Sequence, residues 1–139
     1  MMPELKLRDL FISHVWRKEE NSEYYRLVSL LRDANNFAWR NYSVPEHDPL
    51  NTKTDKELRA KLDAQIKPVN CFVIISGMYV NYRKWIQEEI EIALKYNKPI
   101  IGVVPLGQVS TPKIVQQIAK EMVNWRTDSI VAAIRKYSL

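Results

Sequence analysis

Apolar residues recur along the chain with two different spacings, and the switches between them predict five strands and five helices. Short apolar or alternating runs, typical of strands, occur at residues 5–13, 37–44, 71–75, 99–104 and 122–125. Apolar residues three or four positions apart predict helices around residues 24–31, 58–66, 86–94, 114–118 and 130–137. The two kinds of element alternate along the whole chain.

This alternation predicts an α/β fold with a parallel sheet and helices on both faces, because crossovers between parallel strands are right-handed. Residues 71–75 read Cys-Phe-Val-Ile-Ile without a polar interruption, as expected for a central strand that is covered on both faces. We therefore expect a flavodoxin-like three-layer domain with the strand order 2-1-3-4-5. Ligands of such sheets lie beyond the carboxyl ends of the strands, between the first and third strands.

Helix boundaries carry their own signals. Thr54 and Glu57 form a capping box for the helix that ends at Pro68, and either Thr127 or Asp128 is expected to cap the last helix. The polar residues 46–54 predict a long loop before the first of these helices.

Glu89 has an unusual position on its predicted helix. At about 100° per residue it lies close beside the apolar stripe, while Glu88 and Glu91 lie nearly opposite. The expected stripe consists of Ile86, Ile90, Ala93 and Leu94. A carboxyl group at the edge of a buried face must be desolvated, paired or used, and Trp85 lies one turn before it. From spacing alone, however, a tryptophan that packs beside a surface carboxylate is the commoner interpretation, and we favour it over catalysis by about three to one.

Size and composition are those of an ordinary globular protein. The 139 residues predict one domain over 1–139, with 46% hydrophobic and 27% charged residues. No apolar run approaches the roughly 20 residues that a membrane-spanning helix needs, and no secretory signal precedes the first strand. One cysteine, Cys71, agrees with a reducing compartment and reads as a small buried strand residue. We expect a cytoplasmic protein without membrane contact.

Charge and motifs exclude several classes of protein. The net charge of +5 allows attraction to anions, either nucleic acid or a dinucleotide pyrophosphate, but no base-stacking or recognition motif supports nucleic-acid binding. Three glycines, Gly77, Gly102 and Gly107, provide neither a P-loop nor a GxGxxG fingerprint. His14, His47 and the cysteine have no zinc-site spacing, and no GxSxG elbow is present. We expect no metal.

Several segments together resemble the TIR-like family, and more narrowly the bacterial TIR-like proteins of Thoeris antiphage defence, the ThsB type. They are residues 10–14, the run Asn-Phe-Ala-Trp-Arg-Asn-Tyr-Ser-Val-Pro at 36–45, and Ser-Gly-Met-Tyr at 76–79, followed by Trp85 and Glu89. The most specific pieces are Trp-x-Asn-Tyr-Ser-Val-Pro and the Trp-x-x-x-Glu helix. The resemblance covers almost the whole chain.

This resemblance implies an enzyme that cleaves the nicotinamide–ribose bond of NAD and makes a cyclic ADP-ribose isomer or a related signalling nucleotide. It places the catalytic carboxylate on Glu89. NAD would be the substrate, with no further cofactor, and a separate effector protein would sense the product. The loop at about residues 43–53 would take part in self-association and cover the site. The cationic nicotinamide leaves as a neutral molecule, so a single carboxylate can suffice.

Other candidate residues lie at the expected edge of the sheet or near it. We expect substrate contacts from a set of residues at strand ends and on the glutamate's helix: Ser13, His14, Trp16, Trp39, Asn41, Ser76, Gly77, Tyr79 and Trp85. Strand-end hydroxyls also commonly satisfy backbone groups, and the tryptophans can be core residues. The alternative function is a noncatalytic TIR-like scaffold that acts through protein–protein assembly, with a structural Glu89.

Overall fold

The computed structural model describes residues 6–13, 22–43, 55–76, 83–105 and 113–139. Within them the chain forms, in order, β1 (Arg8–Ser13), α1 (Ser22–Arg32), β2 (Trp39–Asn41), α2 (Asp55–Ile66), β3 (Cys71–Ile75), α4 (Arg83–Lys95), β4 (Ile100–Val104), α5 (Lys113–Ile118), β5 (Glu121–Asn124) and α6 (Thr127–Tyr137). The strands form one parallel sheet in the order β2-β1-β3-β4-β5. The predicted α/β fold and strand order are confirmed. One domain over 1–139 stays a prediction.

The middle of the sheet is β3, as its unbroken apolar run predicted. It lies between β1 and β4, and every residue from Cys71 to Ile75 is buried. Phe72 pairs in register with Phe11 of β1, and their rings stack with centroids 5.4 Å apart. Burial also raises the pKa of the Cys71 thiol to about 12, so this cysteine is a core residue without thiolate reactivity.

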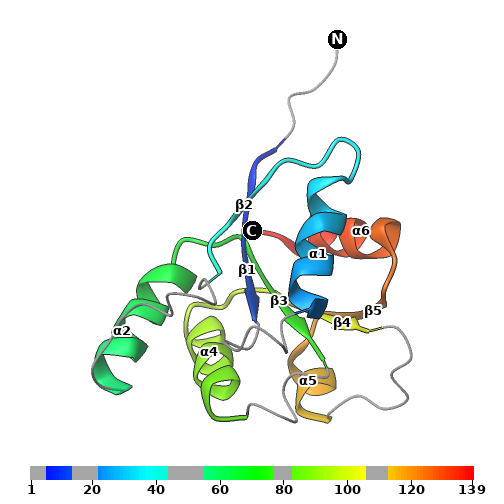
Figure 1. The fold of residues 1–139 in the computed structure, drawn as a ribbon. Helices are drawn as coiled ribbons and strands as arrows, with labels where there is room; N and C mark the ends of the chain where they lie inside the picture. Colours follow the sequence, from blue (N-terminus) through cyan, green and yellow to red (C-terminus); the bar gives the residue numbers. More distant parts are fainter. Residues whose placement is uncertain (1–5, 14–21, 44–54, 77–82, 106–112) are drawn as a thin grey trace.

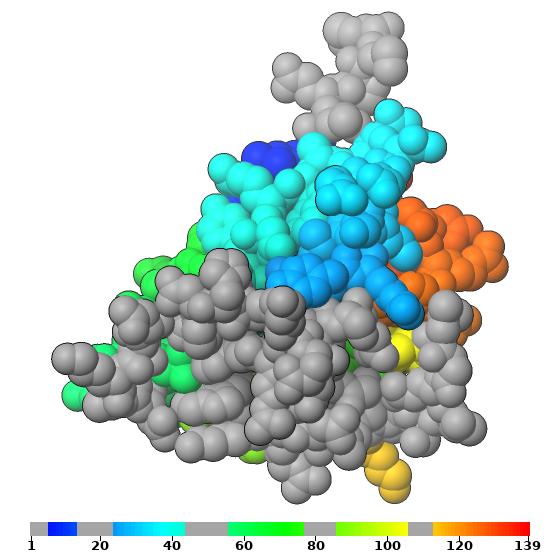
Figure 2. All heavy atoms as spheres, viewed as in Figure 1, coloured from blue at the N-terminus to red at the C-terminus, as the bar shows by residue number. Residues whose placement is uncertain are grey.

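Helices cover both faces of the sheet (Figure 1). The pair α1 and α6 packs together on one face, and the pair α2 and α4 packs together on the other. In the space-filling view of Figure 2, α1 and the segment around β2 lie side by side on the upper part of the molecule, with α6 beside them. None of the helices in the described parts of the chain has the length and apolar character needed to cross a bilayer.

The second strand is shorter than its sequence suggests. The pattern predicted residues 37–44, whereas β2 covers only Trp39–Asn41 at the edge of the sheet. The ladder stops because the backbone N–H of Ile12 donates to the Ser43 side-chain Oγ, 2.8 Å away, instead of to a carbonyl of β2. The Ser43 hydroxyl therefore takes the place of a backbone carbonyl at the point where the chain leaves the sheet.

The expected cap of the last helix is wrong. The N-cap of α6 is Arg126, which makes no side-chain capping hydrogen bond, and both Thr127 and Asp128 lie inside the first turn. Asp128 Oδ1 accepts the N–H of Ser129 at 2.8 Å and stabilises the positive end of the helix dipole from within. The other cap candidate, Thr54, lies outside the described residues.

The end of α4 is a Schellman motif. Asn97 adopts a left-handed conformation with φ 55°, its N–H donates to Leu94 O at 3.0 Å, and the Lys98 N–H donates to Ala93 O at 2.8 Å. These two hydrogen bonds satisfy carbonyls that the helix leaves unpaired, and they direct the chain into β4.

Substitution of Asn97 tests this helix end. Asn97→Ala is expected to lower the free energy of unfolding by about 1 kcal/mol, because a Cβ-bearing residue other than asparagine tolerates the left-handed conformation poorly. Asn97→Gly is expected to match the wild type or exceed its stability. Urea denaturation followed by circular dichroism measures both, and equal losses in the two variants would contradict the motif.

Candidate functional site

Two buried polar side chains from separate elements meet at the end of the first strand. Ser13, the last residue of β1, donates a hydrogen bond from Oγ to Oε1 of Glu89 on α4 at 2.8 Å. Ser13 is 0% exposed and Glu89 is 2% exposed. The pair lies at the carboxyl end of β1, beside β3, which is where a sheet of this order binds its ligands.

The helix buries Glu89 more deeply than the sequence pattern suggested. The expected stripe is correct at Ile86, Ile90 and Ala93, but Leu94 is 47% exposed and Ile92 is 2% exposed instead. At about 100° per residue this correction shifts the buried arc, which then runs from Ile92 to Ile90 over about 160°. Glu89 falls inside that arc and not at its border.

Burial changes the ionisation of this carboxyl group. It raises the pKa of Glu89 to about 8, and the hydrogen bond from Ser13 opposes the rise by favouring the charged form. At pH 7 the free protein therefore holds Glu89 mostly protonated. A carboxyl group that titrates just above neutral pH within a fold's ligand-binding edge is a candidate acid or base.

The neighbouring glutamates of α4 lie in a different environment. Arg59 of α2 forms ion pairs with Glu88 at 3.2 Å and with Glu91 at 3.6 Å. Both contacts join α2 to the outward side of α4. Neighbouring carboxyl groups on α4 thus have different partners. Glu89 accepts a hydrogen bond from a buried hydroxyl, whereas Glu88 and Glu91 pair with a surface arginine.

Ser76 lies at the same edge of the sheet. It directly follows β3, is fully buried, and its backbone N–H donates to Val103 O at 2.9 Å. Because β1 and β3 are adjacent and parallel, the structure brings Ser13 and Ser76 to the same edge, as predicted.

The two candidates on β2 are placed differently. Trp39 pairs with Arg8 at the amino end of β1, about 16 Å along the strand from Ser13 at 3.3 Å per residue. Asn41 lies closer, but both ends of its amide are engaged. Its Nδ2 donates to the Tyr24 hydroxyl at 2.8 Å, and its Oδ1 accepts the Ser43 N–H at 2.9 Å. The structure does not bring Trp39 to the Ser13–Glu89 pair.

Ser43 also lies at this edge of the sheet, although it is not among the predicted substrate contacts. Its Oγ accepts the N–H of Ile12, the residue before Ser13, and its side chain is buried. A hydroxyl residue at the end of a predicted strand, two positions before a proline, is the signal that could have indicated its bond to β1.

The remaining candidates cannot be placed. His14, Trp16, Gly77 and Tyr79 lie outside the described residues, as does the loop from residue 44 to 54. Trp85 belongs to the first turn of α4, but its side chain is not among those described. In the described parts of the chain, no three histidine, cysteine, aspartate or glutamate side chains are grouped so that they could hold a metal ion.

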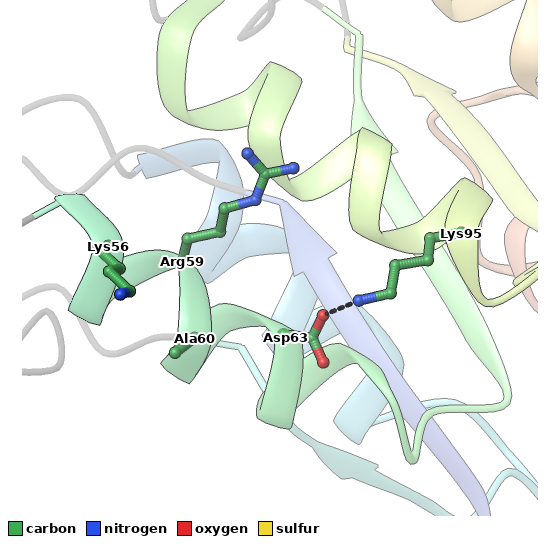
Figure 3. Close-up of a pocket in the computed structure, with 5 residues that line it drawn as sticks. All are labelled: Lys56, Arg59, Ala60, Asp63 and Lys95. Atoms are coloured by element: carbon green, nitrogen blue, oxygen red, sulfur yellow. Dashed lines mark hydrogen bonds and ion pairs between the residues drawn. The ribbon is translucent and has the colours of Figure 1, made fainter.

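A separate pocket of about 420 Å³ lies between α2 and α4 (Figure 3). It is lined by Lys56, Arg59, Ala60, Asp63 and Lys95. Lys95 pairs with Asp63 at 2.7 Å, the Tyr96 hydroxyl also donates to Asp63, and Arg59 is paired with the α4 glutamates. Three of its four charged side chains are thus paired, and the pocket is distinct from the predicted site.

The fold and the buried carboxyl group define a flavodoxin-like α/β domain with a candidate acid–base residue at the ligand-binding edge of its sheet. Comparison with protein families identifies the family of this domain. The model of the Thoeris protein ThsB, TIR-like domain, matches residues 11–110, and the chain belongs to this family. A search of curated proteins found no match.

Solved structures share the fold. Fourteen chains match, including the Clostridium botulinum CMP N-glycosidase BcmB. That similarity has a TM-score of 0.55 at 14% sequence identity and covers 94% of this chain and 100% of that chain.

The pH dependence of stability tests the burial of Glu89. Its pKa is raised from 4.5 to about 8, so the folded protein binds more protons than the unfolded protein between these values. The free energy of unfolding should therefore fall as pH rises from about 4.5 to 8 and level off above. Glu89→Gln should remove this decline and exceed the wild type at pH 8 by about 4 kcal/mol.

Urea denaturation at pH 5, 6, 7, 8 and 9 measures both proteins. Glu88→Gln is the matched control, because it removes an adjacent carboxyl group that is paired with Arg59. If the Glu88 and Glu89 variants behaved alike, burial of Glu89 would not be the cause.

Proposed function

We propose that this protein cleaves the bond between a nucleobase and ribose in a nucleotide, with Glu89 as its catalytic carboxyl group. The substrate we propose is NAD, and the product after nicotinamide release is a cyclic ADP-ribose isomer or a related signalling nucleotide in antiphage defence. The observation that carries the proposal is the buried Ser13–Glu89 pair at the ligand-binding edge of the sheet.

Two comparisons support the class of reaction. The chain belongs to the ThsB TIR-like family. Its fold is also that of a protein described as a CMP N-glycosidase, which acts on a base–ribose bond. Both favour chemistry at the anomeric carbon of a nucleotide over the noncatalytic alternative.

The chemistry of NAD suits one carboxylate. When the bond between ribose C1′ and the nicotinamide nitrogen breaks, its electron pair moves to the nicotinamide, which leaves neutral. Positive charge develops on the ribose, and ionised Glu89 stabilises this oxocarbenium-like transition state. Water or a nucleophilic atom of the same substrate then attacks C1′, giving the hydrolysed or the cyclic product.

The raised pKa of Glu89 has a consequence for this mechanism. In the free protein the carboxyl group is mostly protonated at neutral pH. A cationic nicotinamide placed against it would favour the ionised form and lower the pKa, so binding would release a proton. The substrate thus helps to generate the charge that its own cleavage requires.

A second candidate substrate is a pyrimidine nucleoside monophosphate such as CMP. Neutral cytosine is a poorer leaving group than nicotinamide and is helped by a proton. Burial keeps Glu89 protonated near neutral pH, which is the form of a general acid.

Incubation with substrate tests the proposal. Wild-type protein at high concentration is expected to release nicotinamide from NAD, and Glu89→Gln is expected to be at least about 100-fold slower because the transition-state charge loses its partner. Mass spectrometry of the nucleotide product distinguishes cyclisation from hydrolysis. Glu88→Gln, which keeps the Ser13–Glu89 pair, is the matched control.

Parallel incubations with CMP, followed by detection of cytosine, distinguish the two substrates. No release from either nucleotide by wild-type protein, also under conditions that promote self-association, would favour the scaffold. Such a scaffold would bind itself or a partner equally well with Glu89→Gln.

The pH profile separates the two chemical roles of Glu89. For NAD, kcat/KM is expected to rise about tenfold per pH unit below a pKa near 8 and level off above it, because the free enzyme must lose the proton. For CMP with Glu89 as general acid, kcat/KM should fall above the same value. Steady-state rates from pH 5.5 to 9.5 measure either profile, and a flat profile would exclude both roles.

A further inference from the structure

Ser13 is fixed more firmly than an ordinary surface serine. It pairs in register with Ile74 on β3, and the preceding residue, Ile12, is bonded through its N–H to Ser43 Oγ. The strand thus holds the Ser13 hydroxyl at a set place in the core. Glu89 approaches it from α4 on a flexible side chain, whose orientation the hydrogen bond selects.

The hydrogen bond also determines what this hydroxyl can do for a ligand. Ser13 has one hydroxyl proton, and it is donated to Glu89 Oε1. While that bond is intact, Ser13 cannot donate to a substrate. It engages one carboxyl oxygen and leaves the other, Oε2, for the remaining partners of Glu89.

We propose that Ser13 is a positioning residue, whose hydroxyl holds the Glu89 carboxyl group in one orientation and stabilises it as a carboxylate, and that it acts on the reaction through Glu89. This inference rests on the proposed function for its kinetic test. It assigns Ser13 a role different from the substrate contact that its place at the ligand-binding edge of the sheet predicted.

The surroundings of the pair support this role. The other carboxyl groups of the same helix, Glu88 and Glu91, pair with Arg59 of α2. Lys95, at the end of this helix, pairs with Asp63. The strands beside the pair contribute Ser13 itself and the buried Ser76. Burial raises the pKa of Glu89, and among the described residues the Ser13 hydroxyl lowers it. This hydroxyl therefore favours the ionised form of Glu89.

Kinetics of Ser13→Ala test the proposal. Without the donor, the pKa seen in kcat/KM should lie about one pH unit higher, so that activity at pH 7 falls about tenfold and largely recovers by pH 9.5. Ser13→Thr retains the hydroxyl and should restore the wild-type profile. A rise in KM of equal size at every pH, with an unmoved profile, would instead identify a substrate contact and overturn the proposal.

A second measurement does not depend on catalysis. Carboxyl ¹³C NMR titration, with Glu89→Gln to assign the signal, should give a higher pKa for Glu89 in Ser13→Ala than in the wild type. Ser138→Ala is the control, because it removes a partly buried hydroxyl at the end of α6 that is bonded to Ile134 O and takes no part in the Ser13–Glu89 pair. It should leave this pKa unchanged.

If the alanine variant does not fold, Ser13→Cys replaces it, and its weaker donor should give an intermediate pKa. Equal values in the wild type and the Ser13 variants would overturn the positioning role. Failure of wild-type protein to cleave any nucleotide would refute the proposed function alone, because the titration still decides whether Ser13 controls Glu89.

Discussion

Burying an ionisable side chain in a protein core costs free energy, because the group loses its hydrogen bonds with water and regains only those that its neighbours provide. Here the core accepts Glu89 with a serine hydroxyl at 2.8 Å and apolar side chains on the same face of its helix. The position of this carboxyl group depends on the whole fold. The sheet must bring the end of β1 beneath α4, and α4 must turn its buried arc toward that end. The roles proposed for Glu89 and Ser13 depend on this one contact.

Much of the architecture could be predicted from the sequence, for identifiable reasons. The apolar run at 71–75 marks β3 as central because only a strand covered on both faces can be apolar at every position. The alternation of strand and helix patterns then predicts a parallel sheet. In a parallel sheet the carboxyl ends of β1 and β3 lie at the same edge, which brings Ser13 and Ser76 together there. These inferences depend on patterns repeated over many residues, which tolerate local exceptions.

The errors arose where one tertiary contact decides the outcome. Ser43 shortens β2 by bonding to Ile12, and no periodicity reports such a bond. The burial of Ile92 in place of Leu94 depends on how α4 is rotated against its neighbours. Because of that rotation, Glu89 lies within the buried face of α4 and not at its edge. The pairing of Ser13 with Glu89 was likewise not predicted, because the two residues are 76 positions apart.

The contact between α2 and α4 has a different physical character from the rest of the core. Leu58, Leu62 and Ile66 give α2 a narrow buried stripe, and charged pairs supply much of its remaining attachment, through Arg59 and through Asp63 with Lys95. Dissolved ions screen such surface pairs, whereas they leave apolar burial intact or strengthen it. Rising ionic strength would therefore weaken the attachment of α2 by at most about 1 kcal/mol for each exposed pair and leave its apolar stripe in place. The domain thus has one flank whose stability depends on salt and a central sheet whose stability depends on apolar burial.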